Sequence, residues 1–123
     1  MAIWIVADDD VTEEGCIVVR CGNNFEPLLP RQDLRTYVLP MSWGSPGQGT
    51  LALALAMLAY CLPDYGLALA LHVVFAEEVL MGLPAGGWAI ETHQIIRWCA
   101  EQVADQPNPA FKLYFTQPWG GRS

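Results

Sequence analysis

The sequence predicts a single α+β domain over residues 1–123, in which a small N-terminal antiparallel sheet packs on a helical hairpin and a third helix. Three observations lead to this expectation. Short β-branched segments come first, two Leu/Ala-rich segments follow, and a segment with apolar residues at helical spacing comes last. We expect a strand-rich region over residues 1–42, a helical region over 43–106, and a C-terminal strand and tail over 107–123. No linker or internal repeat divides a chain of one domain's length.

The strands are expected near the N-terminus. Residues 2–7 place apolar side chains on both faces of an extended segment, and residues 16–21 are β-branched in the middle. A Gly-Asn-Asn turn at 22–24 tolerates positive φ and predicts a tight hairpin into a short edge strand over 25–28. Residues 31–42 are expected to be a connector with no long element.

Two apolar helices are predicted over about 49–61 and 65–82, separated by Pro63, with Asp64 as the cap of the second. Their uninterrupted apolar runs reach about 12 and 10 residues, whereas a membrane-spanning helix needs about 20. We therefore expect two buried core helices and no membrane span.

The last third of the chain predicts one more helix. Thr92 is expected to cap a helix over 93–104, whose apolar residues repeat at helical spacing. No element is predicted for residues 88–90. Residues 110–115 alternate weakly and predict a final strand, followed by a loose tail at 119–123.

A glycine-rich loop at 44–49 precedes the first helix, which is the setting of many anion-binding sites. It lacks the lysine of a P-loop, and its glycine spacing differs from the dinucleotide-binding pattern. The favoured interpretation is a tight turn that lets Trp43 pack on the helix, with Thr50 or Ser45 as a helix cap.

The sequence predicts no catalytic residue, no metal site and no cofactor. His72 lies on an apolar stripe between Ala68 and Ala76, so a backbone carbonyl is its expected partner. The four cysteines are expected to be free thiols, because Cys16 and Cys21 would face opposite sides of one strand. The cysteine and histidine spacings do not form a zinc signature.

Charge is the most distinctive surface property of this chain. Six basic against thirteen acidic residues give a net charge of −7, which is the wrong sign for binding nucleic acid directly. The acidic cluster that follows the first strand either keeps an apolar domain soluble or meets a basic surface on another protein. Its candidate partner-binding residues are Asp8, Asp9, Asp10, Glu13 and Glu14.

Residues 43–99 resemble an uncharacterised family of small bacterial proteins. The resemblance is carried by Trp43-Gly44, by Gly47-Gln48-Gly49 and by the alternating Leu/Ala run at 51–56. This family is a domain of unknown function found on phages and other mobile elements. The N-terminal strand with its acidic turn, and the tail after Pro107, look like additions to it. The resemblance implies a mobile-element setting and transfers no catalytic residue.

We therefore expect a non-enzymatic, anti-CRISPR-like inhibitor from a phage or mobile element, whose acidic face blocks a basic surface of a host defence complex such as a CRISPR effector. The alternative is a self-associating accessory or structural protein whose apolar helices form a homodimer, because 53% hydrophobic residues in so short a chain would leave apolar surface exposed. A small enzyme is the third and weakest hypothesis. A cytoplasmic location is expected, because the N-terminus lacks the basic and apolar regions of a signal peptide.

Overall fold

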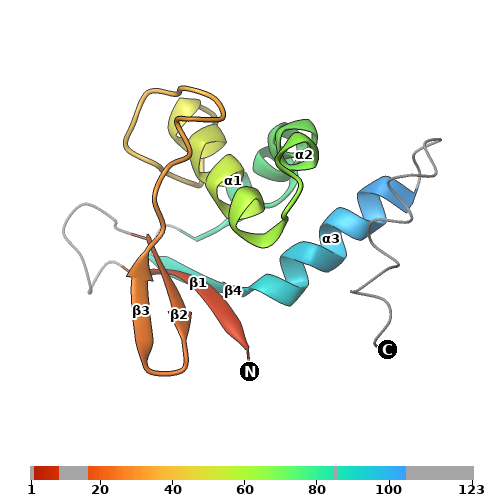
Figure 1. Ribbon diagram of the computed structural model, residues 1–123. Coiled ribbons are helices and arrows are strands. Elements are labelled where there is room, and N and C mark those ends of the chain that lie inside the picture. The colour runs from red at the N-terminus through yellow and green to blue at the C-terminus, as the bar shows by residue number, and fades with distance from the viewer. Residues whose placement is uncertain (1, 9–16, 85, 105–123) are drawn as a thin grey trace.

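The computed structural model describes residues 2–8, 17–84 and 86–104, and confirms the α+β class (Figure 1). Strands and helices form two layers, with α1 and α2 on one side of the sheet (Figure 1). The described elements are β1 (Ile3–Asp8), β2 (Ile17–Cys21), β3 (Asn24–Pro27), α1 (Gln48–Cys61), α2 (Tyr65–Glu78), the 3-10 turn η1 (Leu80–Gly82), β4 (Gly87–Glu91) and α3 (Thr92–Ala104).

The sheet is antiparallel throughout, with the strand order β3-β2-β1-β4. The predicted hairpin is present as β2 and β3. The fourth strand was not predicted: residues 88–90, for which we expected no element, form the middle of β4. β4 pairs with β1, which places Ile90 beside Ile5 and Trp88 beside Ala7. A five-residue strand whose partner lies so far away in the sequence leaves no local hairpin signal.

β1 therefore occupies the centre of the sheet, between β2 and β4. Its side chains alternate as a two-faced strand requires: Ile5 and Ala7 are fully buried beneath the helices, whereas Trp4 is more than one-third exposed. β1 is thus an integral part of the sheet.

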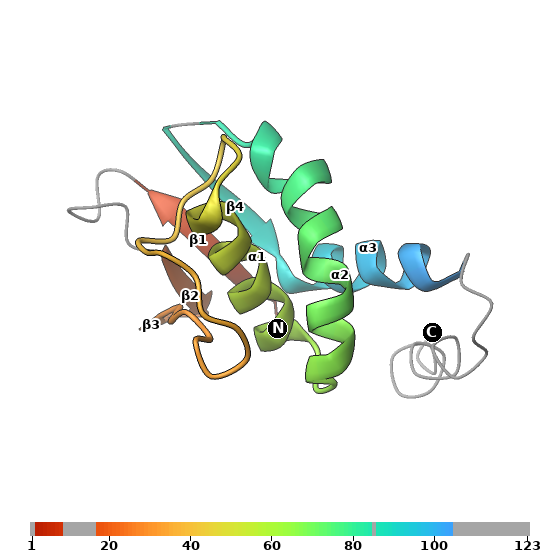
Figure 2. The ribbon, with the colours of Figure 1, turned by 90° about the horizontal axis from the view of Figure 1, so that it is seen from above.

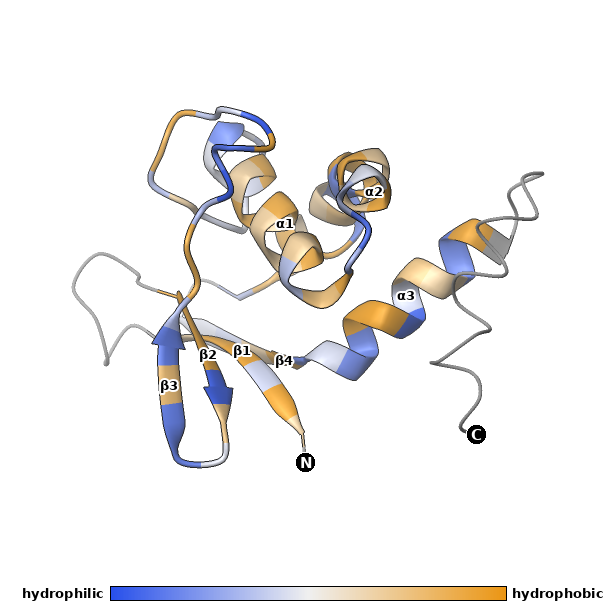
Figure 3. Ribbon diagram, viewed as in Figure 1, coloured by the Kyte–Doolittle hydropathy of each residue, from blue (hydrophilic) through white to orange (hydrophobic). Residues whose placement is uncertain are grey.

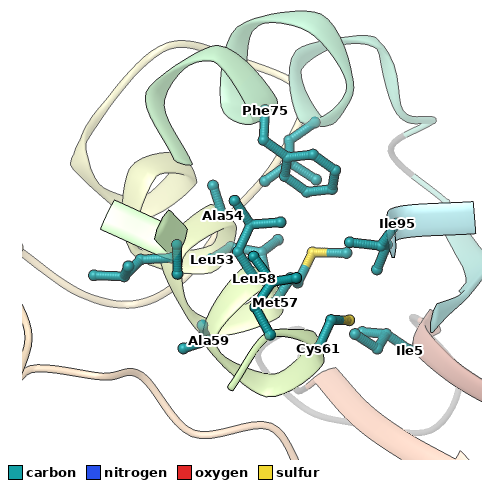
Figure 4. Close-up of a cluster of buried hydrophobic side chains, with 14 of the residues drawn as sticks. Ile5, Leu53, Ala54, Met57, Leu58, Ala59, Cys61, Phe75 and Ile95 are labelled. Carbon is teal, nitrogen blue, oxygen red and sulfur yellow. The ribbon is translucent and has the colours of Figure 1, made fainter. Parts of the chain in front are cut away.

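α1 lies at the centre of the core. Its buried side chains include Met57, Leu58 and Cys61, which lie near Ile5 of the sheet and Ile95 of α3 (Figure 4). Phe75 of α2 packs on the other side of α1. The expectation of a buried core helix is confirmed for α1. The segment Tyr65–Gly82, which contains α2, is long and apolar enough to span a membrane by length and composition, and 39% of it is buried.

The helix ends differ in part from the predictions. Asp64 caps α2 as expected, because its Oδ1 accepts the N–H of Leu67 at 3.2 Å. Gly47 is the N-cap of α1 and supplies no side-chain bond, so the predicted cap by Thr50 or Ser45 is wrong. α2 ends at Glu78, four residues before its predicted end, and η1 follows after Val79.

α3 begins at Thr92, so this residue is the first of the helix and not its cap. The Gln94 side chain instead reaches back and accepts the N–H of Glu91 at 2.9 Å. This contact is the returning half of a capping box, in which the third helical residue satisfies a donor before the helix. The predicted strand at 110–115, the tail and Cys16 lie outside the described residues.

Candidate functional site

His72 is a buried histidine with two hydrogen-bond partners. The side chain is 2% exposed and projects from α2. Its Nδ1 lies 2.7 Å from the carbonyl oxygen of Leu69, which confirms the expected backbone partner. Its Nε2 lies 2.6 Å from the hydroxyl oxygen of Tyr37 in the connector. Sequence reasoning missed Tyr37, because 35 positions separate the two residues and nothing local links them.

The Leu69 carbonyl assigns one ring nitrogen of this histidine. A carbonyl oxygen can only accept, so Nδ1–H donates to Leu69; in the neutral ring, which burial favours, Nε2 then accepts the hydroxyl proton of Tyr37. Burial lowers the pKa of His72; the Leu69 carbonyl opposes this effect, and the nearby charge of Arg35 adds to it. The pair is a closed, neutral link between the connector and α2, and both ring nitrogens are occupied.

Further hydrogen bonds brace the connector internally and join it to α1. The Gln32 side-chain amide bonds both the N–H and the C=O of Tyr37, at 2.9 and 3.3 Å. Gln48, the first residue of α1, accepts the N–H of Val38 at 2.7 Å. These contacts orient the Tyr37 ring toward His72, so the buried pair serves to fasten the connector over the helices.

The glycine-rich loop is a tight turn that is bonded to other parts of the protein. Gly44 has a φ of 83°, and its N–H donates to the Leu80 carbonyl at 2.9 Å. The Thr50 hydroxyl donates to the Ser45 carbonyl at 2.6 Å. Gly49 is required by space, because a Cβ there would lie 2.5 Å from the Pro40 carbonyl oxygen. The loop is therefore built to pack closely, as expected.

Trp43, at the start of this loop, packs against the hydrophobic core, and it also contacts the last strand of the sheet. Its indole meets Trp88 of β4 edge to face, with ring centroids 5.6 Å apart. Its Nε1 donates to the Pro84 carbonyl at 2.9 Å. The loop thereby joins the beginning of α1 to the last strand of the sheet.

The buried thiols are protonated and unreactive at neutral pH. Burial raises the pKa of Cys61 and of Cys99 to about 12, so neither forms a thiolate at neutral pH. Among the described residues, no group of three or more His, Cys, Asp or Glu side chains could hold a metal ion.

The acidic cluster falls almost wholly outside the described residues. Asp9, Asp10, Glu13 and Glu14 lie there, so the structure neither gathers nor separates them. Asp8 is described through its backbone alone: it is the last residue of β1 and pairs with Gly87 of β4. The acidic segment therefore continues directly from the central strand of the sheet.

A shallow cavity of about 280 Å³ lies beside the C-terminal end of α1. Tyr60, Cys61, Glu91 and His93 contribute to its lining, together with apolar residues of β1 and α3. Its volume falls just below the range of about 300–1,000 Å³ that is usual for small-molecule sites. Glu91, His93, Tyr60 and Cys61 are the ionisable residues of its lining, and burial raises the pKa of Tyr60 and that of Cys61, so neither is an activated nucleophile.

Exposed apolar side chains are the remaining candidate for function. Large hydrophobic residues are more than one-third exposed at several places in the described chain (Figure 3 gives the hydropathy along the ribbon). They are Trp4, Phe25, Leu29, Val38, Leu39, Tyr60, Tyr65 and Val73. Two of them, Trp4 and Phe25, belong to the face of the sheet that is turned away from α1.

That outer sheet face carries apolar residues on all four strands, together with one cation and one anion. The strand register aligns Pro27, Val18, Val6 and Ala89 in one row, and Phe25, Arg20, Trp4 and Glu91 in the next. A solvated sheet face normally carries polar residues at these positions. Here the second row contains one cation and one anion, and the first row contains neither. We define these eight residues as the outer sheet face.

α2 also turns apolar residues outward. Gly66, Ala70 and Val73 are exposed and spaced as one helix face, and Leu69 and Val74 beside them are half-buried. The face ends at Glu77, which is exposed. Both surfaces are suited to contact with a protein and neither offers a reactive group.

Comparison with known proteins identifies the family of this chain. The model of a family of unknown function, DUF6166, matches residues 8–101. The match begins at Asp8, so the acidic turn is part of the family domain, contrary to our expectation that it is an addition. Searches of curated proteins and of solved structures each return no match. Because the family model covers most of the chain, this protein belongs to DUF6166, a family of unknown function.

Proposed function

We propose that this protein works by binding another protein and does not catalyse a reaction. The observation that carries the proposal is the contrast between its reactive groups and its surface. His72 is buried and fully hydrogen-bonded, and the thiols of Cys61 and Cys99 are protonated. The exposed surface, in contrast, presents aromatic and aliphatic side chains that bind proteins well.

In its specific form, the proposal is an anti-CRISPR-like inhibitor from a phage or mobile element, acting in the cytoplasm on a host defence complex. The net charge of −7 supports it, because an acidic protein is attracted to a groove built for nucleic acid. The acidic residues that follow Asp8 also lie within the family match. In this proposal they cover basic residues of a CRISPR effector and compete with its nucleic acid.

The test uses target cleavage by a panel of purified CRISPR effectors, with and without the full-length protein. One variant changes Asp9, Asp10, Glu13 and Glu14 to lysine. Its matched control carries the same change of net charge on other elements, at the exposed positions Glu26, Glu77, Glu78 and Glu101. Inhibition that is lost in the first variant and retained in the second supports the proposal. Uninhibited cleavage across the panel, or equal loss in both variants, contradicts it.

The second candidate function is self-association as a homodimeric accessory protein. The exposed apolar side chains of the sheet and of α2 favour it, because a second copy of the chain could bury them. Sedimentation of the full chain over a range of concentrations tests it directly. A monomer throughout that range contradicts this candidate and leaves the first one standing.

A further inference from the structure

We propose that the outer sheet face is a homodimer interface, in which two copies pack sheet on sheet about a two-fold axis that passes by Trp4. This inference rests on the self-association proposed above and names the surface and the geometry that produce it. It differs from the sequence-based alternative, which assigned the dimer contact to the apolar helices.

The helices are the poorer choice for this contact. α1 buries ten of its fourteen residues, so this helix has little surface to offer. The exposed face of α2 consists mainly of small side chains, Gly66 and Ala70 with Val73. The outer sheet face presents Trp4, a large aromatic side chain that is 37% exposed on the central strand. Large aromatic side chains of this kind contribute most to protein interfaces.

The charges of the outer sheet face are complementary to a second copy. Arg20 lies on the strand next to Trp4 on one side, and Glu91 lies on the strand next to it on the other. A two-fold axis that runs parallel to β1 and passes by Trp4 exchanges these two positions. Arg20 of each copy then faces Glu91 of the second copy, and the two Trp4 side chains meet at the axis.

The same rotation brings apolar positions together in the neighbouring row. Val6 faces its own equivalent, and Val18 faces Ala89 of the second copy, because the strand order exchanges β2 with β4 about β1. Packed sheets lie about 10 Å apart, a spacing that Trp and Val side chains fill from both sides. Within the two rows, each cation therefore meets an anion of the second copy.

The size of this surface predicts a weak dimer. The rotation about β1 overlaps the three strands β2, β1 and β4, and three strands at about 4.8 Å spacing and about 17 Å in length form a face that is small beside the roughly 800 Å² per partner of a stable interface. We therefore expect a reversible monomer–dimer equilibrium in the micromolar range and not a permanent dimer.

Sedimentation equilibrium of the full chain, from low micromolar to millimolar concentration, measures this association. Ala89→Arg places a long cation in the apolar row at an exposed position and is expected to raise the dimer dissociation constant at least about tenfold. Val73→Arg on α2 is the matched control and should leave it unchanged. Circular dichroism confirms that each variant is folded.

A charge exchange tests the geometry independently. Arg20→Glu and Glu91→Arg should each raise the dissociation constant several-fold, and the double variant R20E/E91R should restore it. A dimer that is sensitive to V73R but not to A89R overturns the proposed surface while self-association stands. Failure of the double variant to recover overturns the proposed axis. A monomer at every concentration overturns this inference together with the self-association on which it rests.

Discussion

α1 and α2 have the same length and nearly the same character, yet the fold treats them differently. Each has fourteen residues with repeated Leu and Ala. Ten residues are buried in α1 and six in α2, because α1 lies between the sheet, α2 and the connector, whereas α2 has neighbours on one side. Figure 2 shows α2 at the outside of this arrangement. An apolar composition indicates that a helix is buried by other elements. How many of its residues are buried depends on which distant elements pack against it.

The largest expected effect comes from shortening a side chain on each helix. Leu58→Ala in α1 should lower the free energy of unfolding by about 2–5 kcal/mol, because it leaves a cavity beside fully buried neighbours. Val73→Ala in α2 should change it by less than about 0.5 kcal/mol, because Val73 is 42% exposed. Urea unfolding measures both values. Equal losses would show that α2 is covered in solution.

The second residue of each helix offers a matched pair of glycines. A methyl group at Gly49 of α1 would lie 2.5 Å from the Pro40 carbonyl, so Gly49→Ala should cost about 1–3 kcal/mol as the connector shifts. At Gly66 of α2 the nearest atom is Asp64 Oδ1 at 3.3 Å, which leaves much more room. Gly66→Ala should be close to neutral, because the helix preference of alanine offsets that contact. Thermal unfolding of the two variants side by side checks the difference.

The buried His72 should make the stability of the protein depend on pH. Folding lowers the pKa of His72. Below about pH 6.5 the histidine is therefore protonated in the unfolded chain while it stays neutral in the folded chain. Stability is therefore fully present above that pH and falls as the pH drops, by at most about 1.4 kcal/mol per pH unit.

Urea titrations at several pH values between 5 and 8, a range of about three pH units, measure this dependence. His72→Gln removes the titrating ring, and the difference between its pH profile and that of the unmodified protein isolates the histidine from the carboxylates. Parallel profiles would contradict the buried, neutral state.

Tyr37→Phe should lower the free energy of unfolding by about 1–3 kcal/mol at neutral pH, because His72 Nε2 loses its donor.

The smallest expected effect concerns the helix caps. Asp64→Ala removes the bond to the Leu67 N–H and should cost about 1 kcal/mol. Gly47→Ser in α1 is the converse change, but its φ of 150° is unfavourable for a side chain, so no gain is expected. A stabilising serine at position 47 would show that the start of α1 relaxes more easily than the connector contacts imply.

Much of the fold could be predicted from local patterns. The hairpin followed from a β-branched run and a Gly-Asn-Asn turn, and the start of α2 followed from Asp64. The failures were of another kind. β4 forms because it pairs with the free edge of β1. The early end of α2 depends on η1 and on the hydrogen bond from Gly44 to Leu80. No short window of sequence contains those partners.

The candidate site divides in the same way. The Leu69 carbonyl was predictable as the partner of His72, because it lies one helical turn away. Tyr37 was not predictable, because the connector had to cross the helices before the two side chains could meet. The outer sheet face also needed the register, since Pro27, Val18, Val6 and Ala89 come from four separate strands.

Composition and local pattern were sufficient for the fold class, the buried character of α1, the hairpin, and the surplus of acidic residues. Each of these depends on residue content or on contacts within a few positions. Three other features required the three-dimensional arrangement: β1 is central, β4 completes the sheet, and one face of the sheet stays uncovered by the described helices. Those outcomes depend on which distant segments pack together, because burial is shared among elements and no single element encodes it.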